Sequence, residues 1–377
     1  MSKYAFLLWR EPALSLAELK SIFHSVEQRW DFAYVEAEGE TIEIHKKWLG
    51  WTIKIGKILA EGLNKADILN FLVEKTGERV QPEKKLRIGI DSFVPSLSNL
   101  VFKVKDALRA KGNSIRVVQH EQGRIKNATT IHEKLIEHGV EFIIFADKNH
   151  FTIAQTVWIQ DIESYSERDM NRDRSMTVGM MPPKIAQIMI NLGTKGDHNT
   201  LVWDPFCGLG TTLIEALHAW HNTLRGSDLE TSMVTTTQKN IEKQPQYQKE
   251  NIKIFPLDAT KLDTYNLGQT TIVVTEGMLG RNFTQATLTQ QAALQERKKL
   301  TQLYQSFLNS GYKNTDIKSM VFCLPFWNIG RETVYMPEIS QLSKEWHIDP
   351  LCLSWKRYMV HTRPGQSVGR EIVVVRR

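Results

Sequence analysis

Residues 201–216 read LVWDPFCGLGTTLIEA, an apolar strand followed by a carboxylate, a glycine turn and the start of a helix. In parallel α/β sheets, ligands bind beyond the carboxyl ends of the strands, where turns of this kind lie. Gly208 and Gly210 lack a Cβ, so the chain can turn tightly there and approach a ligand closely. The segment therefore predicts a parallel sheet with a ligand site at this turn.

The same turn argues against a dinucleotide site. Such a site requires G-x-G-x-x-G and a helix N-terminus directed at a pyrophosphate. Here the third glycine is absent, and Asp204 stands directly before the turn. Because a carboxylate repels phosphate and suits a cationic or amine-bearing ligand, we expect S-adenosylmethionine as the cofactor. The G-x-G element alone is equally compatible with a plain strand-to-helix turn in another α/β enzyme.

The longer string D-P-F-x-G-x-G-T-x-x-I-E-A is more specific. It closely resembles the first motif of methyltransferases that modify exocyclic amines of nucleic-acid bases. This resemblance implies an α/β fold with a Rossmann-like, seven-stranded methyltransferase domain. The pattern after residue 200 agrees, because five strand–helix units and two late strands predict a doubly wound sheet whose last pair returns antiparallel.

Composition narrows the class of protein further. The chain has 377 residues, enough for two or three domains. Its net charge of +6 suits a polyanionic partner. The three cysteines are far apart and form no C-x-x-C pair, so we expect no metal site, no disulfide framework and a cytoplasmic location. No stretch reaches the roughly 18 apolar residues of a membrane span, so we expect no membrane association.

We expect four segments along the chain. Residues 1–80 form an α+β region, residues 81–162 a mixed sheet with one basic side, residues 163–179 a polar connector, and residues 180–377 the methyltransferase domain. The second segment resembles a THUMP domain, preceded by a ferredoxin-like region. THUMP domains bind RNA in several tRNA-modifying enzymes, so the resemblance implies RNA binding by this part.

Two local patterns in the first segment predict secondary structure. Ser15 and Glu18 have the spacing of a capping box at the start of a helix, in which Glu18 reaches back to the helix start. Residues 41–45 alternate between apolar and polar side chains, which predicts a strand.

Acidic residues end three successive strands of the predicted sheet. After Asp204, Asp228 ends the second strand, where a carboxylate can accept both ribose hydroxyls. Asp258 ends the third strand and can accept from the adenine amine. For both, the alternative is a helix N-cap or turn residue. The expected cofactor-binding residues are Asp204, Pro205, Phe206, Gly208, Gly210, Thr211, Asp228, Leu229, Asp258 and Ala259.

The end of the fourth strand is the expected site of methyl transfer. Amine methyltransferases commonly have Asn/Asp-Pro-Pro-Tyr/Phe there, whereas this chain has Thr275-Glu276-Gly277-Met278. We predict Thr275 and Glu276 as catalytic residues, because their oxygens can orient an amine for in-line attack. The proline and the aromatic ring are absent, and Phe283 is a candidate replacement for that ring. A plain turn without a catalytic role is the alternative.

Basic residues gather between Lys103 and Lys126, where seven stand against two acids. A solvated helix face is the alternative to nucleic-acid binding for such a run. In the R-P-G-Q-S-V-G-R ending, Arg363 and Arg370 are candidates for phosphate contact, with surface charges at a β-hairpin as the alternative. The predicted RNA-binding residues are Lys103, Lys105, Arg109, Lys111, Arg116, Arg124, Lys126, Arg363 and Arg370.

Together, G-M-M-P-P-K-I-A-Q-I-M-I-N-L, the D-P-F-C-G-L-G-T-T motif and the R-P-G-Q ending resemble the THUMP-containing tRNA guanosine N2-methyltransferases. The resemblance implies S-adenosylmethionine-dependent methylation of the N2 amine of a tRNA guanosine, at position 10 in this family, with tRNA as the partner. Two alternatives stay open: a DNA amine methyltransferase, and a non-catalytic RNA-binding protein that retains the fold. The need for a small activating subunit, as in some relatives, is also open.

Overall fold

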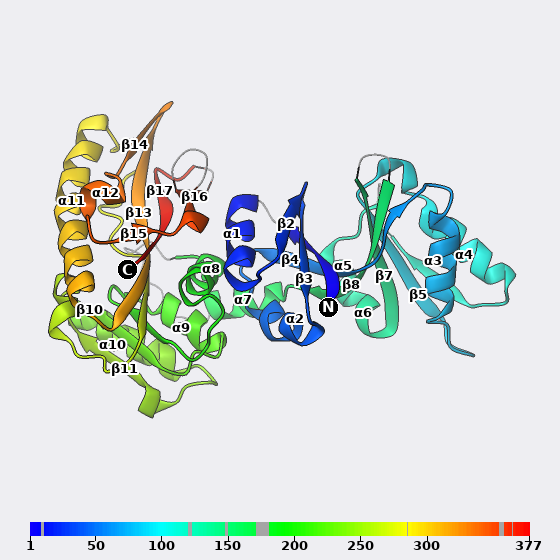
Figure 1. Cartoon of the computed structure of the whole chain (residues 1–377), viewed down its shortest axis with the longest axis horizontal. Helices are drawn as coiled ribbons and strands as arrows, with labels where there is room; N and C mark the ends of the chain where they lie inside the picture. Colours follow the sequence, from blue (N-terminus) through cyan, green and yellow to red (C-terminus); the bar gives the residue numbers. More distant parts are fainter. Residues whose placement is uncertain are drawn as a thin grey trace. The chain divides into compact units, whose positions relative to one another are not determined.

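The structure is a computed structural model that describes residues 1–8, 11–119, 123–147, 150–170, 181–284, 286–353, 358–363 and 365–377. Its contacts divide the chain into two compact units, which Figure 1 shows together with the element labels. The first unit comprises Met1–Arg10, Ser25–Lys46 and Thr52–Asp161. The second comprises Glu11–His24, Lys47–Trp51 and Ile162–Arg377. These boundaries differ from the predicted segments, whose functional division stays a prediction.

A mixed eight-stranded sheet forms the first unit, in the order β2-β3-β1-β4-β8-β7-β5-β6. Its strands are β1 (Ser2–Leu8), β2 (Val26–Arg29), β3 (Phe32–Ala37), β4 (Thr52–Leu63), β5 (Leu86–Ser92), β6 (Ile115–Val118), β7 (Gly139–Asp147) and β8 (His150–Ile159). Helices α3 (Ile68–Gly77) and α4 (Leu100–Ala110) share one hydrophobic core with the sheet. The short helices α5 (Asn127–His132) and α6 (Leu135–His138) follow β6. Because β4 pairs with β8, the two predicted N-terminal regions share one sheet.

The strand predicted at residues 41–45 is wrong. Gly39–His45 form helix α2, in which Ile42 is buried while Ile44 is 49% exposed. In a strand, both isoleucines would face the same side, because side chains alternate with a period of two. One buried position is enough for a short surface helix, so this alternation did not distinguish the two structures.

Three charged side chains are buried at the centre of the first unit. Lys54 Nζ lies 2.9 Å from Asp91 Oδ2 and 2.6 Å from Glu141 Oε1, and all three side chains are at most 1% exposed. Burial lowers the pKa of Lys54, but the Glu141 and Asp91 carboxylates outweigh it and raise that pKa overall. Thr156 also donates to Glu141, at 2.7 Å. This network ties β4, β5, β7 and β8 together through hydrogen-bonded charges.

The second unit is built on a sheet in the order β11-β10-β9-β12-β13-β17-β15, with β14 paired to β13 and β16 to β17. Its strands are β9 (Leu201–Asp204), β10 (Leu224–Asp228), β11 (Ile252–Pro256), β12 (Thr271–Thr275), β13 (Ile317–Ile329), β14 (Glu332–Tyr335), β15 (His347–Ile348), β16 (Met359–His361) and β17 (Val368–Arg376). Strands β9 to β13 pair in parallel, and β17 returns antiparallel to β13. The predicted doubly wound sheet with a late antiparallel strand is confirmed.

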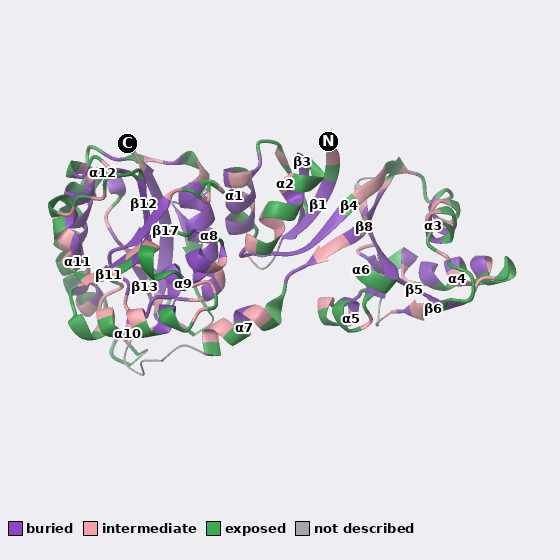
Figure 2. Ribbon diagram, turned by 90° about the horizontal axis from the view of Figure 1, so that it is seen from below, coloured by how far each residue is buried: buried purple, intermediate pink, exposed green. Residues whose placement is uncertain are grey.

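Helices cover both faces of this sheet, as Figure 1 shows. One core contains residues of α8 (Pro183–Thr194), α9 (Thr211–His218) and α10 (Thr231–Glu242). A separate core on the other face contains α11 (Gln290–Lys313) and α12 (Ile339–Leu342). Figure 2 shows most of β12, β13 and β17, which lie between these layers, as buried. None of the described helices is long and apolar enough to cross a membrane.

Helix α1 (Pro12–Ile22) belongs to the second unit, where Glu18 holds it in place. Glu18 Oε1 accepts from Gly50 N–H at 2.8 Å and from Asn191 Nδ2 at 2.7 Å. Burial raises the pKa of Glu18 to about 7. The predicted capping box is therefore wrong: the helix begins before Ser15, and Glu18 satisfies backbone amides of residues 50 and 51 instead.

The predicted connector is partly helical. Ile162–Met170 form helix α7, where Arg168 Nε lies 2.8 Å from Glu215 Oε1 of α9. The rest of the connector, together with Met180, lies outside the described residues.

Replacing Lys54 by methionine would leave two carboxylates buried without this cation. We expect Lys54→Met to lower the free energy of unfolding by about 3–5 kcal/mol, measured by urea unfolding of the full chain. The matched control is Lys57→Met on the same strand, where the exposed side chain predicts a change within about 0.5 kcal/mol. Equal effects of the two substitutions would show that the buried network does not stabilise the unit.

Candidate active site

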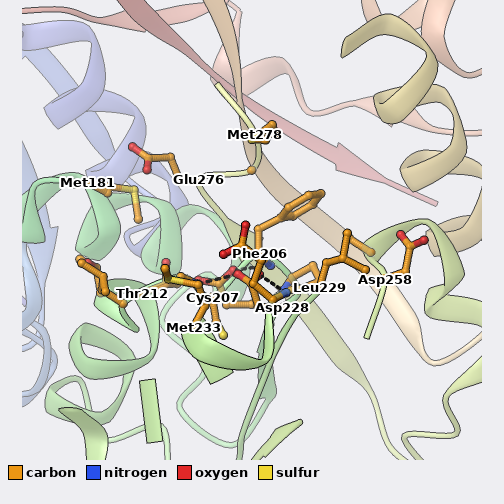
Figure 3. A pocket seen from close by; sticks show the side chains of 18 of the residues that line it. Met181, Phe206, Cys207, Thr212, Asp228, Leu229, Met233, Asp258, Glu276 and Met278 are labelled. Atoms are coloured by element: carbon orange, nitrogen blue, oxygen red, sulfur yellow. Dashed lines mark hydrogen bonds between the residues drawn. The ribbon is translucent and has the colours of Figure 1, made fainter. Parts of the chain in front are cut away.

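A cavity of about 350 Å³ lies at the carboxyl ends of β9, β10, β11 and β12. Its size falls within the range of small-molecule sites. Figure 3 shows Glu276 on one side of this cavity and Asp258 on the other. Its lining comprises Met181, Asp204, Pro205, Phe206, Cys207, Gly208, Leu209, Thr211, Thr212, Asp228, Leu229, Glu230, Met233, Asp258, Ala259, Glu276, Gly277, Met278 and Leu303.

The glycine turn is held by hydrogen bonds from neighbouring elements. Gly208 and Gly210 have φ angles of +51° and +85°, a region that favours glycine. Asp228 Oδ2 accepts from the Gly208 N–H at 3.0 Å, and the Thr237 hydroxyl donates to the Gly208 carbonyl at 2.7 Å. Asn240 donates to the next carbonyl at 3.0 Å. These bonds keep the turn open toward the cavity.

Asp204 is a carboxyl buried at the cavity, only 2% exposed. Burial raises its pKa to about 7, although hydrogen bonds from the Thr275 and Thr212 side chains and the Phe206 N–H favour the ionised form. Thr275 is itself fully buried, and its hydroxyl accepts from the Gly277 N–H at 3.2 Å. Thr275 therefore lies behind Asp204, outside the cavity lining, which differs from its predicted position as a direct acceptor for a substrate amine.

The other two strand-end carboxylates make the turn and N-cap contacts that were one alternative, and they also line the cavity. Asp228 accepts backbone N–H groups of Gly208 and Glu230, and Asp258 accepts from Thr260 as the N-cap of a short 3₁₀ helix. The Thr260 backbone N–H contributes most to lowering the pKa of Asp258. Both carboxylates also line the cavity. Their local turn contacts orient them, and they remain available to a ligand.

Glu276 meets a buried arginine at the other side of the cavity. Arg370 Nε lies 2.6 Å from Glu276 Oε1, and the two side chains are 6% and 18% exposed. Burial raises the pKa of Glu276, although Arg370 opposes this shift. The Tyr304 hydroxyl lies within hydrogen-bond distance of the Met278 carbonyl, at 3.1 Å, and of the Cys323 carbonyl, at 2.8 Å, and Gly277 has a φ of +71°. The loop after β12 is thus fixed by β17 and α11.

Most predicted cofactor residues come together in this cavity. Of the ten, Gly210 is the one outside the lining, and its place is at the N-cap of α9. The predicted site residues did not include eight further lining side chains: Met181, Cys207, Leu209, Thr212, Glu230, Met233, Met278 and Leu303. Several of these adjoin predicted residues in the sequence, whereas Met181 and Leu303 come from other segments and reach the cavity through tertiary packing.

The predicted RNA-binding residues of the first unit lie on α4, on β6 and in the loop before α5. Lys103, Arg109, Lys111 and Lys126 are exposed, and Lys105 is half-buried. They are candidates for phosphate contact.

Two arginines of the same set are already paired. Arg116 lies 2.9 Å from Glu133, and Arg124 lies 2.6 Å from Asp91 with its guanidinium 3.6 Å from the centre of the Phe93 ring. Their charges are partly compensated within the unit, so they offer less to a phosphate than the exposed residues do.

The C-terminal candidates differ from one another. Arg363 is exposed, whereas Arg370 is buried and paired with Glu276, so Arg370 is not a surface charge at a hairpin. Phe283, the candidate aromatic replacement, lines a neighbouring hollow instead of the cavity that contains Glu276.

The charge of the cavity restricts its ligand. Five carboxylates line it, and no lysine or arginine is among the described lining residues. Such a lining disfavours phosphate and favours a cation, while carboxylate oxygens can also accept from hydroxyl and amino groups. Within the described ranges, no cluster of three His, Cys, Asp or Glu side chains is arranged to hold a metal ion.

Part of the chain is similar to known methyltransferases. Residues 171–325 match the family model described as RMKL-like, methyltransferase domain. The chain is 29% identical over 182 residues to a tRNA (guanine(10)-N2)-dimethyltransferase of Methanocaldococcus jannaschii, covering 47% of this chain and 50% of the relative. It is 26% identical over 250 residues to the enzyme of the same name from Methanothermobacter thermautotrophicus, covering 64% and 68%. The chain thus spans half the length of the first relative.

Among solved structures, TrmN from Thermus thermophilus matches with a TM-score of 0.51 and 14% identity, covering both chains completely. This match supports the fold. The comparisons confirm the predicted resemblance to methyltransferases, and the structural match supports the predicted Rossmann-like fold. They do not test the THUMP assignment.

Asp204 makes the stability of the ligand-free chain depend on pH. Its folded pKa of about 7 lies above the ordinary 3.8, so folding favours the protonated carboxyl. Below pH 3.8 the carboxyl is protonated in both the folded and the unfolded chain, so burying it costs no charge desolvation. The destabilisation grows as pH rises from there and reaches its full size above about pH 7. The free energy of unfolding of the unmodified protein should therefore fall between pH 5 and pH 8. We expect Asp204→Asn to make this fall about 3 kcal/mol smaller, measured by urea unfolding.

Asp197→Asn is the control for this experiment. The Asn199 N–H and other hydrogen bonds lower the pKa of Asp197, so this carboxylate is ionised throughout pH 5 to 8. Asp197→Asn is therefore expected to leave the fall in unfolding free energy over this pH range unchanged. An Asp204→Asn chain with the same pH dependence as the unmodified protein would contradict the buried charge.

Proposed function

Taking residues 171–325 as a methyltransferase domain, we propose that this chain methylates the N2 amine of a guanosine in tRNA, using S-adenosylmethionine. The observation that carries the proposal is the cavity lined by five carboxylates without a described lysine or arginine. The named relatives act on guanine 10 of tRNA, which makes this nucleotide the proposed target.

The residues present fit S-adenosylmethionine. Asp204 lies at the glycine turn for the cationic methionine part, and Asp228 at the next strand end for the ribose hydroxyls. Asp258 suits the adenine amine, and Leu229 and Met233 provide an apolar wall for the adenine ring. When bound, the cofactor supplies the methyl group as an electrophile.

Glu276 is the proposed catalytic residue. Its carboxylate accepts an N–H of the guanine amine, which aligns the nitrogen lone pair for attack. After transfer, the same carboxylate takes the proton that the methylated amine releases, a role that its raised pKa favours. Arg370 anchors one oxygen of Glu276 and leaves the other for this task.

A cysteine nucleophile is not part of this proposal. Cys207 lines the cavity, but burial raises the pKa of its thiol, so the thiolate is disfavoured. This supports amine methylation over carbon-5 methylation of a pyrimidine, which requires a reactive cysteine. The free cysteines Cys207 and Cys323 also support a reducing cytoplasm as the site of the reaction.

In the proposed function, the exposed basic residues of α4 and the loop before α5 bind the tRNA backbone. Such contacts weaken as salt rises, because phosphate binding releases counterions. Binding of duplex DNA in preference to tRNA would favour the DNA amine methyltransferase alternative instead.

Replacing Glu276 tests the catalytic assignment. We expect Glu276→Gln to lower kcat by about 100-fold, measured by mass spectrometry of nucleosides from tRNA incubated with enzyme and S-adenosylmethionine. The affinity for S-adenosylhomocysteine should stay unchanged, which verifies a folded pocket. Glu250→Gln, at an exposed site, is the matched control. Full activity of Glu276→Gln would remove Glu276 from the mechanism.

Asp228 tests the cofactor assignment separately. We expect Asp228→Asn to raise the Kd for S-adenosylhomocysteine at least tenfold in calorimetric titration, because the ribose hydroxyls lose a charged acceptor. Asp316→Asn removes a carboxylate that accepts from Gly268 N–H, and it should leave this Kd unchanged. An unaltered Kd in Asp228→Asn would place the ribose elsewhere.

A further inference from the structure

A second hollow of about 330 Å³ lies beside the proposed active site. It is formed by the loop after β12, residues 279–284, and by the turn before β17, residues 365–367, together with Val368 and Arg370 of β17. Arg370 lines this hollow, while its ion-pair partner Glu276 lines the cavity described above. The 2.6 Å contact between these two side chains therefore separates two adjacent cavities.

Two arginines provide hydrogen-bond donors to this hollow, one from a buried position and one from an exposed position. Arg370 is buried, and its Nε is used by Glu276. Arg281 is 59% exposed, and its Nε lies 3.2 Å from Glu296. Within the described residues, each of these arginines makes its side-chain hydrogen bond through Nε. The two terminal nitrogens of each guanidinium are therefore left for a ligand. Each carboxylate offsets part of the charge of its arginine, as for Arg116 and Arg124, but it also orients the guanidinium, whose terminal N–H groups can still donate to a phosphate oxygen.

An aromatic ring stands among these donors. The Arg281 guanidinium lies 5.2 Å from the centre of the Phe283 ring, and Phe283 is half-buried in the wall of the hollow. Gln366 and Ser367 add polar side chains from the facing turn. Fixed guanidinium donors beside a flat ring match a nucleotide, because phosphate oxygens accept from arginine and every base can stack on an aromatic face.

We propose that this hollow binds the nucleotide directly next to the methylated guanosine, with Arg281 and Arg370 donating to its phosphodiester and Phe283 stacking on its base. The inference rests on the proposed function, because it requires a polynucleotide substrate. A nucleotide whose base enters the cavity beside Glu276 remains joined through its phosphates to the two nucleotides next to it in the RNA. One of these nucleotides must therefore lie against the protein surface directly beside the cavity. The hollow across the Glu276–Arg370 pair is that position.

The site is tested first by RNA kinetics. We expect Arg281→Gln and Phe283→Leu each to raise KM for a transcribed tRNA about tenfold while the Kd for S-adenosylhomocysteine is unchanged. Two variants are used because Arg281→Gln also removes the cation beside Glu296, which is buried. Lys313→Gln, at the far end of α11, is the charge-matched control and should leave both constants unchanged. Unchanged KM in both site variants would overturn the proposal.

Cross-linking locates the nucleotide directly. A photoreactive benzoylphenylalanine in place of Phe283 should cross-link to tRNA at the nucleotide adjacent to the methylated one, mapped by reverse transcription. A cross-link at a distant nucleotide, or none in an enzyme that methylates tRNA, would overturn the proposal. Failure of the unmodified protein to methylate tRNA would instead overturn the proposed function, so the two results are distinguishable.

Discussion

The buried carboxyl of Asp204 is the constraint on which the second unit depends. It lies at the end of a central strand and faces a cavity whose described lining has no basic side chain. Its hydrogen bonds with Thr212 and Thr275 compensate only part of the desolvation, since its pKa remains near 7. A cationic ligand would reduce this desolvation cost. The least favourable buried charge of the ligand-free unit thus lies where a ligand can compensate for it. The glycine turn gives the ligand access to the same point.

Local motifs were sufficient to predict which residues come together along the strand-end side of the cavity. Asp204, Gly208 and Asp228 lie within two strand ends and one turn, and the carboxyl ends of parallel strands meet at one edge of the sheet. The sequence pattern of strands and turns is therefore enough to place these three residues at one edge of the sheet. The parallel order of β9 to β13 follows from the same alternation of strands and helices.

The contacts that the sequence did not predict join residues far apart in the chain. Arg370 is 94 residues from Glu276, and no local pattern links a loop after β12 to β17. Thr275 and Glu276 are neighbours, yet the strand directs Thr275 toward Asp204 while Glu276 reaches the cavity. Glu18 fitted a local capping pattern, but its partners include Asn191, 173 residues away. Tertiary packing overrides local preference in each case.

The chain changes unit at residues 11, 25, 47, 52 and 162, so neither unit is a continuous stretch of sequence. Helix α1 contributes to a core of the second unit, although a long stretch of the first unit separates it in sequence from residues 162–377. Recombination at a single junction would hence separate residues 162–377 from a helix that packs in their core. Such interleaving favours inheritance of the two halves as a pair, with little freedom for either to be exchanged between protein families.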